Sequence, residues 1–287
     1  MKLFIAAVAF LSFTFAAPAQ QDNSSDNGFT NRAEGKKLTV KKSKEGKWVE
    51  YLDVDLNISP DTSVAEYYEL IVYKSNAPTG KARIYDRSSG VLYMDLNYTN
   101  GKRNGAWKKY WGPSGLVFKD GNFRNDTLVG VLKEYYENGA LKWETPYANG
   151  AENGLEKEYY ESGKLQQESP WVNGQSTGVM KTYYESGVLK GETPYVNGLM
   201  NGMYKERYES GKLKGEINYS NNMRNGVEKE YYESGVLKAE TPYVDDKMEG
   251  VAKEYYESGK LQTETRYVND TESGVKNFDE NGKEIKQ

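Results

Sequence analysis

The chain has 287 residues and contains no cysteine and no histidine. Disulfides, thiolate or imidazole metal sites, and catalysis by a cysteine nucleophile or a histidine base are therefore excluded. Its 38 basic and 42 acidic residues give a net charge of −4, whereas a nucleic-acid groove needs a basic face, so no nucleic-acid partner is expected. Tyrosine (25) and glycine (29) are abundant, and their spacing organises the rest of the sequence.

The N-terminus has the form of a secretory signal peptide over residues 1–19. Lys2 supplies the positive start, Leu3 to Phe15 form an apolar run, and Ala17-Pro18-Ala19 places small residues before a cleavage point. The alternatives are a membrane span or a buried strand, but a span needs about 20 apolar residues and this run is shorter. We expect export to the periplasm, the outer surface or the medium, with no transmembrane span in the mature chain.

A repeat of 24 residues follows a polar segment, residues 20–45, that is predicted to be a flexible leader. The period divides the rest into divergent repeats with an insertion (46–104), regular repeats (105–274) and a truncated capping repeat (275–287). Two glycine series carry the period, namely Gly139, Gly163, Gly187, Gly211, Gly235 and Gly259, and Gly130, Gly154, Gly178, Gly202, Gly226 and Gly250.

Each unit is predicted to form two β-strands. In the unit that begins at Gly226, a first strand leads to the turn Glu233-Ser234-Gly235, and a second strand runs from Val236 to Val244. Short strands separated by turn signals roughly every 8–12 residues are typical of an all-β meander. Proline cannot donate to a strand ladder, so we expect its repeat position to be paired on one side only or to bulge. The prolines at this position are Pro146, Pro170, Pro194 and Pro242.

Columns of similar residues predict which face is buried. The eighth position after the turn glycine is aromatic, as in Trp171, and the second position is aliphatic, as in Leu165. Side chains alternate along a strand, so we expect both columns on one buried face and the acidic fifth position, as in Glu168, on the other. The sequence leaves open which face carries the lysine column of the first strand.

The candidate binding surface consists of tyrosines and lysines on the first strand of each unit. Adjacent tyrosines point to opposite faces, so we expect one of each pair to be structural and the other to be available to a partner. With the acidic column, the lysines form either a solvated, self-compensating face or a striped docking surface. The residues are Tyr135, Tyr136, Tyr159, Tyr160, Tyr183, Tyr184, Tyr208, Tyr231, Tyr232, Tyr255 and Tyr256, with Lys133, Lys157, Lys181, Lys205, Lys229 and Lys253.

No catalytic, cofactor or metal site is predicted. The carboxylates recur identically in every unit, whereas a catalytic site normally depends on one special group in one cleft. In the irregular insertion, Asp53-Val54-Asp55-Leu56-Asn57 echoes the start of a calcium loop, but the glycine and the closing glutamate of that motif are absent. We therefore expect a protein that is not an enzyme.

The repeated unit Gly-x-x-Lys-Glu-Tyr-Tyr-Glu-Ser-Gly-x-Leu-Lys, followed by an aromatic residue and Asn-Gly, resembles the MORN repeat. More closely it resembles the bacterial variant of the YwqK-type antitoxin family, with the cleanest match from Gly130 to Val275. The resemblance implies an elongated single-layer array of antiparallel β-hairpins, a scaffolding role and, in some members, contact with lipid headgroups. The antitoxin name implies binding and neutralising a partner protein, but the export signal argues against a cytosolic toxin.

The main functional hypothesis is an exported, non-catalytic scaffold that binds a protein partner. Interfaces favour tyrosine, and the repetition offers the same contact many times. One alternative is binding of a glycan or cell-wall polymer by an exposed aromatic row. A second alternative is association with a membrane lipid surface, which the acidic balance of the chain disfavours.

Overall fold

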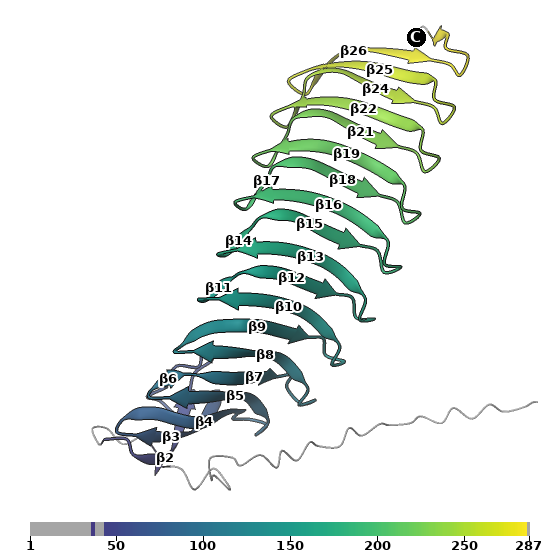
Figure 1. The fold of residues 1–287 in the computed structure, drawn as a ribbon. Helices are drawn as coiled ribbons and strands as arrows, with labels where there is room; N and C mark the ends of the chain where they lie inside the picture. Colours follow the sequence, from purple (N-terminus) through teal and green to yellow (C-terminus); the bar gives the residue numbers. More distant parts are fainter. Residues whose placement is uncertain (1–35, 38–42, 286–287) are drawn as a thin grey trace, which may run out of the picture.

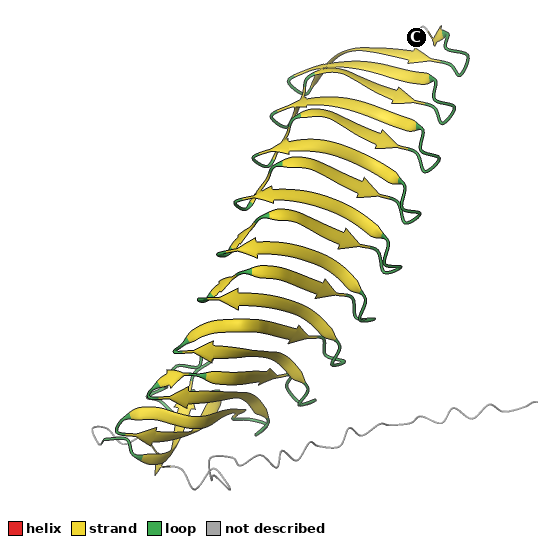
Figure 2. Ribbon diagram, viewed as in Figure 1, coloured by secondary structure: helices red, strands yellow, loops and turns green. Residues whose placement is uncertain are grey.

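The computed structural model describes residues 36–37 and 43–285, so the predicted signal peptide and most of the predicted leader lie outside the described residues. The described chain forms an elongated sheet whose strands run across its long axis, with the N-terminal hairpins at one end and β26 (Thr271–Phe278) near the other (Figure 1). Figure 2 shows strands joined by turns along its whole length, which confirms the predicted all-β array of hairpins. None of the described residues forms a helix that is long and apolar enough to cross a membrane.

The strands pair antiparallel with their neighbours in the chain, except that β1, within the predicted leader, pairs in parallel with β2. The N-terminal strands are β1 (Lys36–Lys37), β2 (Gly46–Leu52), β3 (Tyr67–Lys74), β4 (Ala77–Asp86), β5 (Leu92–Thr99), β6 (Lys102–Arg103), β7 (Gly105–Tyr110) and β8 (Val117–Arg124). The following strands are β9 (Thr127–Tyr135), β10 (Leu141–Ala148), β11 (Ala151–Glu152), β12 (Gly154–Tyr159), β13 (Leu165–Val172), β14 (Gln175–Ser176), β15 (Gly178–Tyr183), β16 (Leu189–Val196), β17 (Leu199–Met200), β18 (Gly202–Arg207), β19 (Leu213–Ser220), β20 (Met223–Arg224), β21 (Gly226–Tyr231), β22 (Leu237–Val244), β23 (Lys247–Met248), β24 (Gly250–Tyr255), β25 (Leu261–Val268), β26 (Thr271–Phe278) and β27 (Glu284–Ile285).

Each regular unit is a well-paired hairpin joined to the next by a shorter junction. Strands β12 and β13 pair at six positions, whereas β13 pairs with β14 at two positions and with β15 at two more. Pro170 lies between these two short sets and is paired with neither β14 nor β15. On the other side of the strand it is paired with Leu155 of β12. The proline therefore lies where its missing N–H is tolerated, as the sequence predicts.

The turn between units also contributes to the junction. Asn173 and Gly174 have φ angles of 50° and 78°, the two positive values of a type I′ hairpin turn, which explains the recurring Asn-Gly pairs. The Gly174 N–H donates to the carbonyl oxygen of Glu152 in the preceding unit at 2.9 Å. The same bond recurs from Gly198 to Ser176 at 2.8 Å. Each turn thus closes one unit and binds the previous one.

A β-bulge at the start of each second strand places the aliphatic column on the face opposite to the predicted one. The register shifts between Glu158 and Tyr159, so Leu165 lies opposite Tyr159. Opposed residues share a face, so the aliphatic second position lies with the tyrosine and acidic columns and not with the aromatic eighth position. On the face that carries the aromatic eighth position, the sixth position after the turn glycine is buried. Ser169 and Ile217, which stand there, are 4% and 2% exposed.

The divergent N-terminal hairpins form a closed core that the regular units lack. Leu56, from the insertion, packs against this core and helps to cover it. A second small cluster, Val49 and Leu70, lies apart from it. The core residues are Trp48, Leu52, Ile71, Tyr73, Ala82, Ile84, Leu96 and Trp107.

The glycine that begins a first strand lies against the proline of the preceding unit wherever that unit has one, and a larger residue would collide with the proline ring. Gly202 has a φ of +120°, and a Cβ added there would lie 3.0 Å from Cγ of Pro194. Gly226 has a φ of +106° but would meet nothing within 4 Å. In the unit before Gly226, Asn218 stands at the repeat position that Pro194 occupies before Gly202.

We predict that Gly202→Ala lowers the free energy of unfolding more than Gly226→Ala does. Both variants strain a backbone of positive φ, at about 1 kcal/mol, but only the first forces a methyl group against a proline ring, which adds about 1–3 kcal/mol. Urea unfolding measures the difference, and adding Pro194→Ala to Gly202→Ala should recover it. Equal losses in the two glycine variants would contradict this contact.

Candidate functional site

The lysine and acidic columns lie directly opposite each other on one face of the sheet, which we call the ladder face. Each lysine except the last, Lys276, stands between two carboxylates, as Lys157 does between Glu144 and Glu168. This settles which face the lysines occupy, and it neutralises the row along its length. Exposed pairs of this kind contribute less than about 1 kcal/mol each. The row alternates in sign through Asp95, Lys108, Asp120, Lys133, Glu144, Lys157, Glu168, Lys181, Glu192, Lys205, Glu216, Lys229, Glu240, Lys253, Glu264 and Lys276.

The first tyrosine of each pair lies on the ladder face and bonds to the preceding unit. The Tyr159 hydroxyl donates to Oε2 of Glu144 at 2.9 Å, and the Tyr183 hydroxyl donates to Oε2 of Glu168 at 2.9 Å. Burial, together with these carboxylates, raises the pKa of Tyr159 and of Tyr183 to about 12, so both phenols remain protonated donors. Tyr135, Tyr231 and Tyr255 make the same bond, to Asp120, Glu216 and Glu240.

The second tyrosine of each pair bonds to the following unit. The Tyr160 hydroxyl donates to the backbone carbonyl of Tyr183 at 2.7 Å. Both tyrosines of a pair therefore hold neighbouring units together, and the expectation that one of them is left free is wrong. The equivalent donors are Tyr136, Tyr184, Tyr208, Tyr232 and Tyr256, whose acceptors are the carbonyl oxygens of Tyr159, Arg207, Tyr231, Tyr255 and Phe278.

A row of exposed apolar side chains runs beside the charged row on the ladder face, and we call it the apolar lane. Leu155, opposite Pro170, is typical. Its members are between 39% and 51% exposed, so the array itself leaves much of their apolar surface in water. Sequence reasoning missed them, although the apolar residue after each first-strand glycine is itself periodic. They are Val131, Leu155, Val179, Met203, Val227 and Val251 from first strands, Val172, Val196, Val244 and Val268 from second strands, and Leu199 and Met223 from the short strands β17 and β20.

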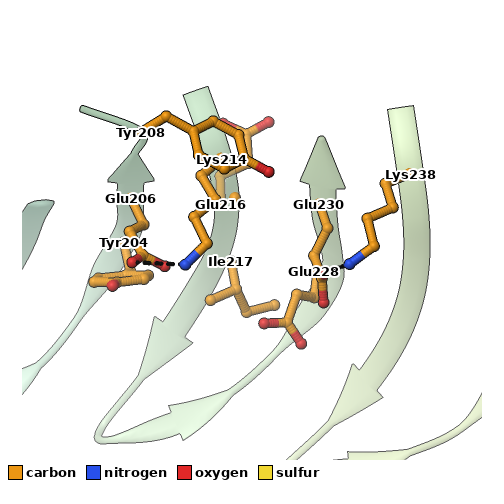
Figure 3. Close-up of a pocket in the computed structure, with 10 residues that line it drawn as sticks. Tyr204, Glu206, Tyr208, Lys214, Glu216, Ile217, Glu228, Glu230 and Lys238 are labelled. Atoms are coloured by element: carbon orange, nitrogen blue, oxygen red, sulfur yellow. Dashed lines mark hydrogen bonds and ion pairs between the residues drawn. The ribbon is translucent and has the colours of Figure 1, made fainter. Parts of the chain in front are cut away.

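The opposite side of the sheet carries the aromatic eighth position, and we call it the aromatic face. A hollow of about 230 Å³ opens there, lined by Tyr204 and Ile217 among others (Figure 3). Two ion pairs border it: Nζ of Lys214 lies 3.0 Å from Glu206, and Nζ of Lys238 lies 3.2 Å from Glu230. This mixture of a ring and hydrogen-bonding groups suits a polar ligand with an apolar surface. Within the described part of the chain, no group of three or more acidic residues is placed to hold a metal ion.

The N-terminal core encloses a pair of carboxylates that the repeat does not predict. Glu50 and Glu69 lie opposite each other on β2 and β3 and are 1% and 6% exposed. Lys44 forms an ion pair with Glu50, and the Tyr73 hydroxyl donates to Oε2 of Glu50 at 3.0 Å. Burial, reinforced by the charge of Glu50, raises the pKa of Glu69 to about 8. Because Glu69 is enclosed, its protonation acts on stability.

We predict that Tyr160→Phe lowers the free energy of unfolding by about 1 kcal/mol, because it removes the hydroxyl that bonds to the next unit. Tyr195→Phe is the matched control, since no hydrogen bond joins the Tyr195 hydroxyl to the described residues. Chemical denaturation of both variants measures the difference. A loss as large in the control would show that the ring, and not the hydroxyl, matters.

We predict that the chain loses stability as pH rises from about 4.5 to about 8. The pKa of Glu69 is higher in the folded chain than its ordinary value of 4.5, so the folded state binds the proton more tightly over this range. The full contribution is present below pH 4.5, and the loss reaches a few kcal/mol (~2–4) above pH 8. Unfolding at pH 5 and pH 9 should show a smaller loss in Glu69→Gln, and an unchanged loss in the exposed control Glu161→Gln. Identical losses in Glu69→Gln and the parent would contradict the role of Glu69.

Comparison with known families identifies the repeat. The MORN repeat variant matches residues 128–149, 152–173, 176–197, 200–221, 224–245 and 248–269. No curated protein matches the chain. MORN repeats in general form binding or scaffold modules and are generally non-catalytic. The chain thus carries six MORN repeat variant units, and divergent hairpins extend the same sheet towards its N-terminus.

Proposed function

We propose that the chain is an exported scaffold that binds a protein partner through the apolar lane. The observation that carries this proposal is the lane itself. Monomeric proteins rarely expose contiguous apolar patches larger than a few hundred Å² (~300–600), and larger ones mark interaction sites. The tyrosine hydroxyls are bonded within the sheet and the charged row alternates in sign, so the lane is the apolar surface of the ladder face that remains for a partner.

Repetition of the lane strengthens this proposal. Val179 and Val227, for example, occupy the same place two units apart, so a partner that spans several units meets the same contact more than once. Linked contacts raise the overall affinity beyond that of any one of them. A long partner, or several copies of a short one, would suit such a surface.

Export and neutralisation are part of the proposal. The signal peptide predicted over residues 1–19 supports export, and N-terminal sequencing of the mature protein should begin at Gln20. An antitoxin-like role then requires a toxin that reaches the same compartment. Recovery of the uncleaved chain in the cytosol would remove export from the proposal and leave the binding surface untouched.

Saccharide binding is a second candidate, which the hollow of Figure 3 favours. The Tyr204 ring can stack on the apolar face of a sugar, while the bordering carboxylates accept its hydroxyl hydrogens. Retention on purified cell-wall polymer that is lost in Tyr204→Ala, but kept when Val179→Lys and Val227→Lys are combined, would favour this candidate over a protein partner.

We predict that Val179→Lys combined with Val227→Lys abolishes capture of a partner from the envelope of producing cells. Two lysines in the lane must be desolvated on binding, which costs several kcal/mol (~2–5). Ser186→Lys combined with Ser234→Lys, on exposed turns, adds the same charge and should preserve capture. Circular dichroism checks that both variants fold. Equal capture by the two double variants would overturn the lane as the binding surface.

A further inference from the structure

We infer that the hollow on the aromatic face binds one neutral sugar ring per chain, in the unit that begins at Gly202. The inference rests on the second candidate above, saccharide binding, and deepens it by assigning the size and the charge of the ligand and a role to each lining residue. It does not use the apolar lane on the ladder face, so the two surfaces can be tested separately.

The hollow lies over the middle of β19, between the first strands β18 and β21 of two consecutive units (Figure 3). Gly215 and Ile217 form its floor, and Ile217 is buried. In the strand register Gly215 lies between Glu206 on β18 and Glu230 on β21. Because Gly215 has no side chain, space is left between these two carboxylates.

The apolar floor and the ring beside it interrupt the repeat. Tyr204 lies opposite Ile217 in the register, and its ring meets the ring of Tyr219 edge-on, with centroids 6.4 Å apart. Among the six MORN repeat variant units, this is the one with an aromatic and an apolar residue at these two positions. The other five units carry Leu132, Glu156, Met180, Glu228 and Ala252 at the first position, and Thr145, Ser169, Thr193, Thr241 and Thr265 at the second. A departure from an otherwise copied pattern at two adjacent positions marks this hollow as a distinct site.

The charges around the hollow balance, which favours a neutral ligand. Glu206 and Glu230 each lie within 3.0–3.2 Å of a lysine ammonium. The third carboxylate of the hollow, Glu228, lies 3.8 Å from a guanidinium nitrogen of Arg224. A cation that entered the hollow would compete with these basic groups, whereas a neutral ligand displaces none of them.

The two lysine–glutamate pairs suit the hydroxyl groups of a sugar. The hydrogen bond to Glu206 raises the pKa of Lys214, and the bond to Glu230 raises the pKa of Lys238, so both lysines remain charged donors. Each ammonium has three N–H groups, and each carboxylate has several acceptor sites. A sugar hydroxyl can therefore donate to the carboxylate and accept from the ammonium of the same pair.

The size of the hollow limits the ligand to one ring. Its volume of about 230 Å³ lies below the range of about 300–1,000 Å³ that is usual for drug-sized ligands. A pyranose over Ile217 would place its apolar face on the Tyr204 ring and its hydroxyls at the two pairs. The equivalent places over Gly191 and Ala239 have Met180 and Glu228 instead of the tyrosine, so we expect one site per chain.

Methyl NMR of the full mature chain tests the site, because Ile217 lies in its floor and isoleucine is rare in the chain. The probes are the methyl glycosides of glucose, galactose and N-acetylglucosamine, with butylammonium chloride as an aliphatic cation. At least one glycoside should shift the Ile217 methyl signals saturably, with a dissociation constant on the order of 1–10 mM, and should leave Ile71 and Ile84 of the N-terminal core unmoved. No saturable shift with any glycoside, or tighter binding of butylammonium than of every glycoside, would overturn the inference.

Two variants alter the hollow with residues that the repeat already accepts. Gly215→Gln fills it with the residue that stands at this position as Gln167, and an added Cβ would lie 3.3 Å from the nearest backbone carbonyl oxygen. Tyr204→Met replaces the ring with the residue of the preceding unit. We expect Gly215→Gln to abolish the glycoside-dependent shift and Tyr204→Met to raise the dissociation constant by about 10-fold. Ala239→Gln makes the same change one unit further on and is the matched control, which should bind as the parent does.

The outcomes separate this inference from the proposed function. Binding of the glycoside by Gly215→Gln as tightly as by the parent would overturn the inference. Retention of cell-wall polymer without any shift of Ile217 would also overturn it and would leave saccharide binding elsewhere on the array. Val179→Lys combined with Val227→Lys should keep the glycoside-dependent shift, whether or not capture of a protein partner is lost. Unmoved signals of Ile71 and Ile84 show that each variant is folded.

Discussion

The whole array depends on the short junction between consecutive hairpins. A hairpin such as β12–β13 is paired at six positions, but its link to β14 and β15 has only two pairs with each. The missing contacts are supplied from outside the strand ladder. The Tyr160 hydroxyl bonds forward to the carbonyl of Tyr183, the Tyr159 hydroxyl bonds back to Glu144, and the turn amide of Gly174 bonds back to Glu152. These side chains recur because every junction needs them.

This dependence determines which surface can serve function. A single-layer sheet has no core of its own, so its most abundant aromatic residues are used to hold neighbours together. The charged row alternates in sign along the ladder face, where a lysine such as Lys157 lies opposite a carboxylate on each neighbouring strand. On the ladder face of the regular units, the lane beside the row remains exposed and apolar, from Val131 to Val268. The proposed partner surface therefore consists of apolar side chains that the contacts between hairpins do not use.

The sequence predicts the period, the strands and the turns well, because each has a local cause. Asn173-Gly174 adopts two positive φ angles, and Pro170 excludes a second pairing partner. The face of each column was harder to predict. One bulge residue moves Leu165 to the other face, and a bulge has no sequence signal in this repeat.

The candidate site was predicted only in part, for a similar reason. Tyrosine was expected to be available because it is common at interfaces, but its hydroxyl finds an acceptor one unit away that no single unit reveals. The buried pair of Glu50 and Glu69 also lies beyond sequence reasoning, since it depends on how the insertion closes over the first hairpins. Contacts between units, and contacts formed only in the irregular N-terminal part, can be identified only from the structure.

Removal of one whole unit tests most directly the claim that each hairpin is stabilised only by its neighbours. Deletion of residues 154–177 joins Asn153 to Gly178 and restores the junction sequence of a regular unit. We expect a folded chain that is shorter by about 10 Å, with a lower urea midpoint and a denaturant slope reduced in proportion to the lost surface. A chain that no longer folds, or one with unchanged stability and slope, would contradict this claim.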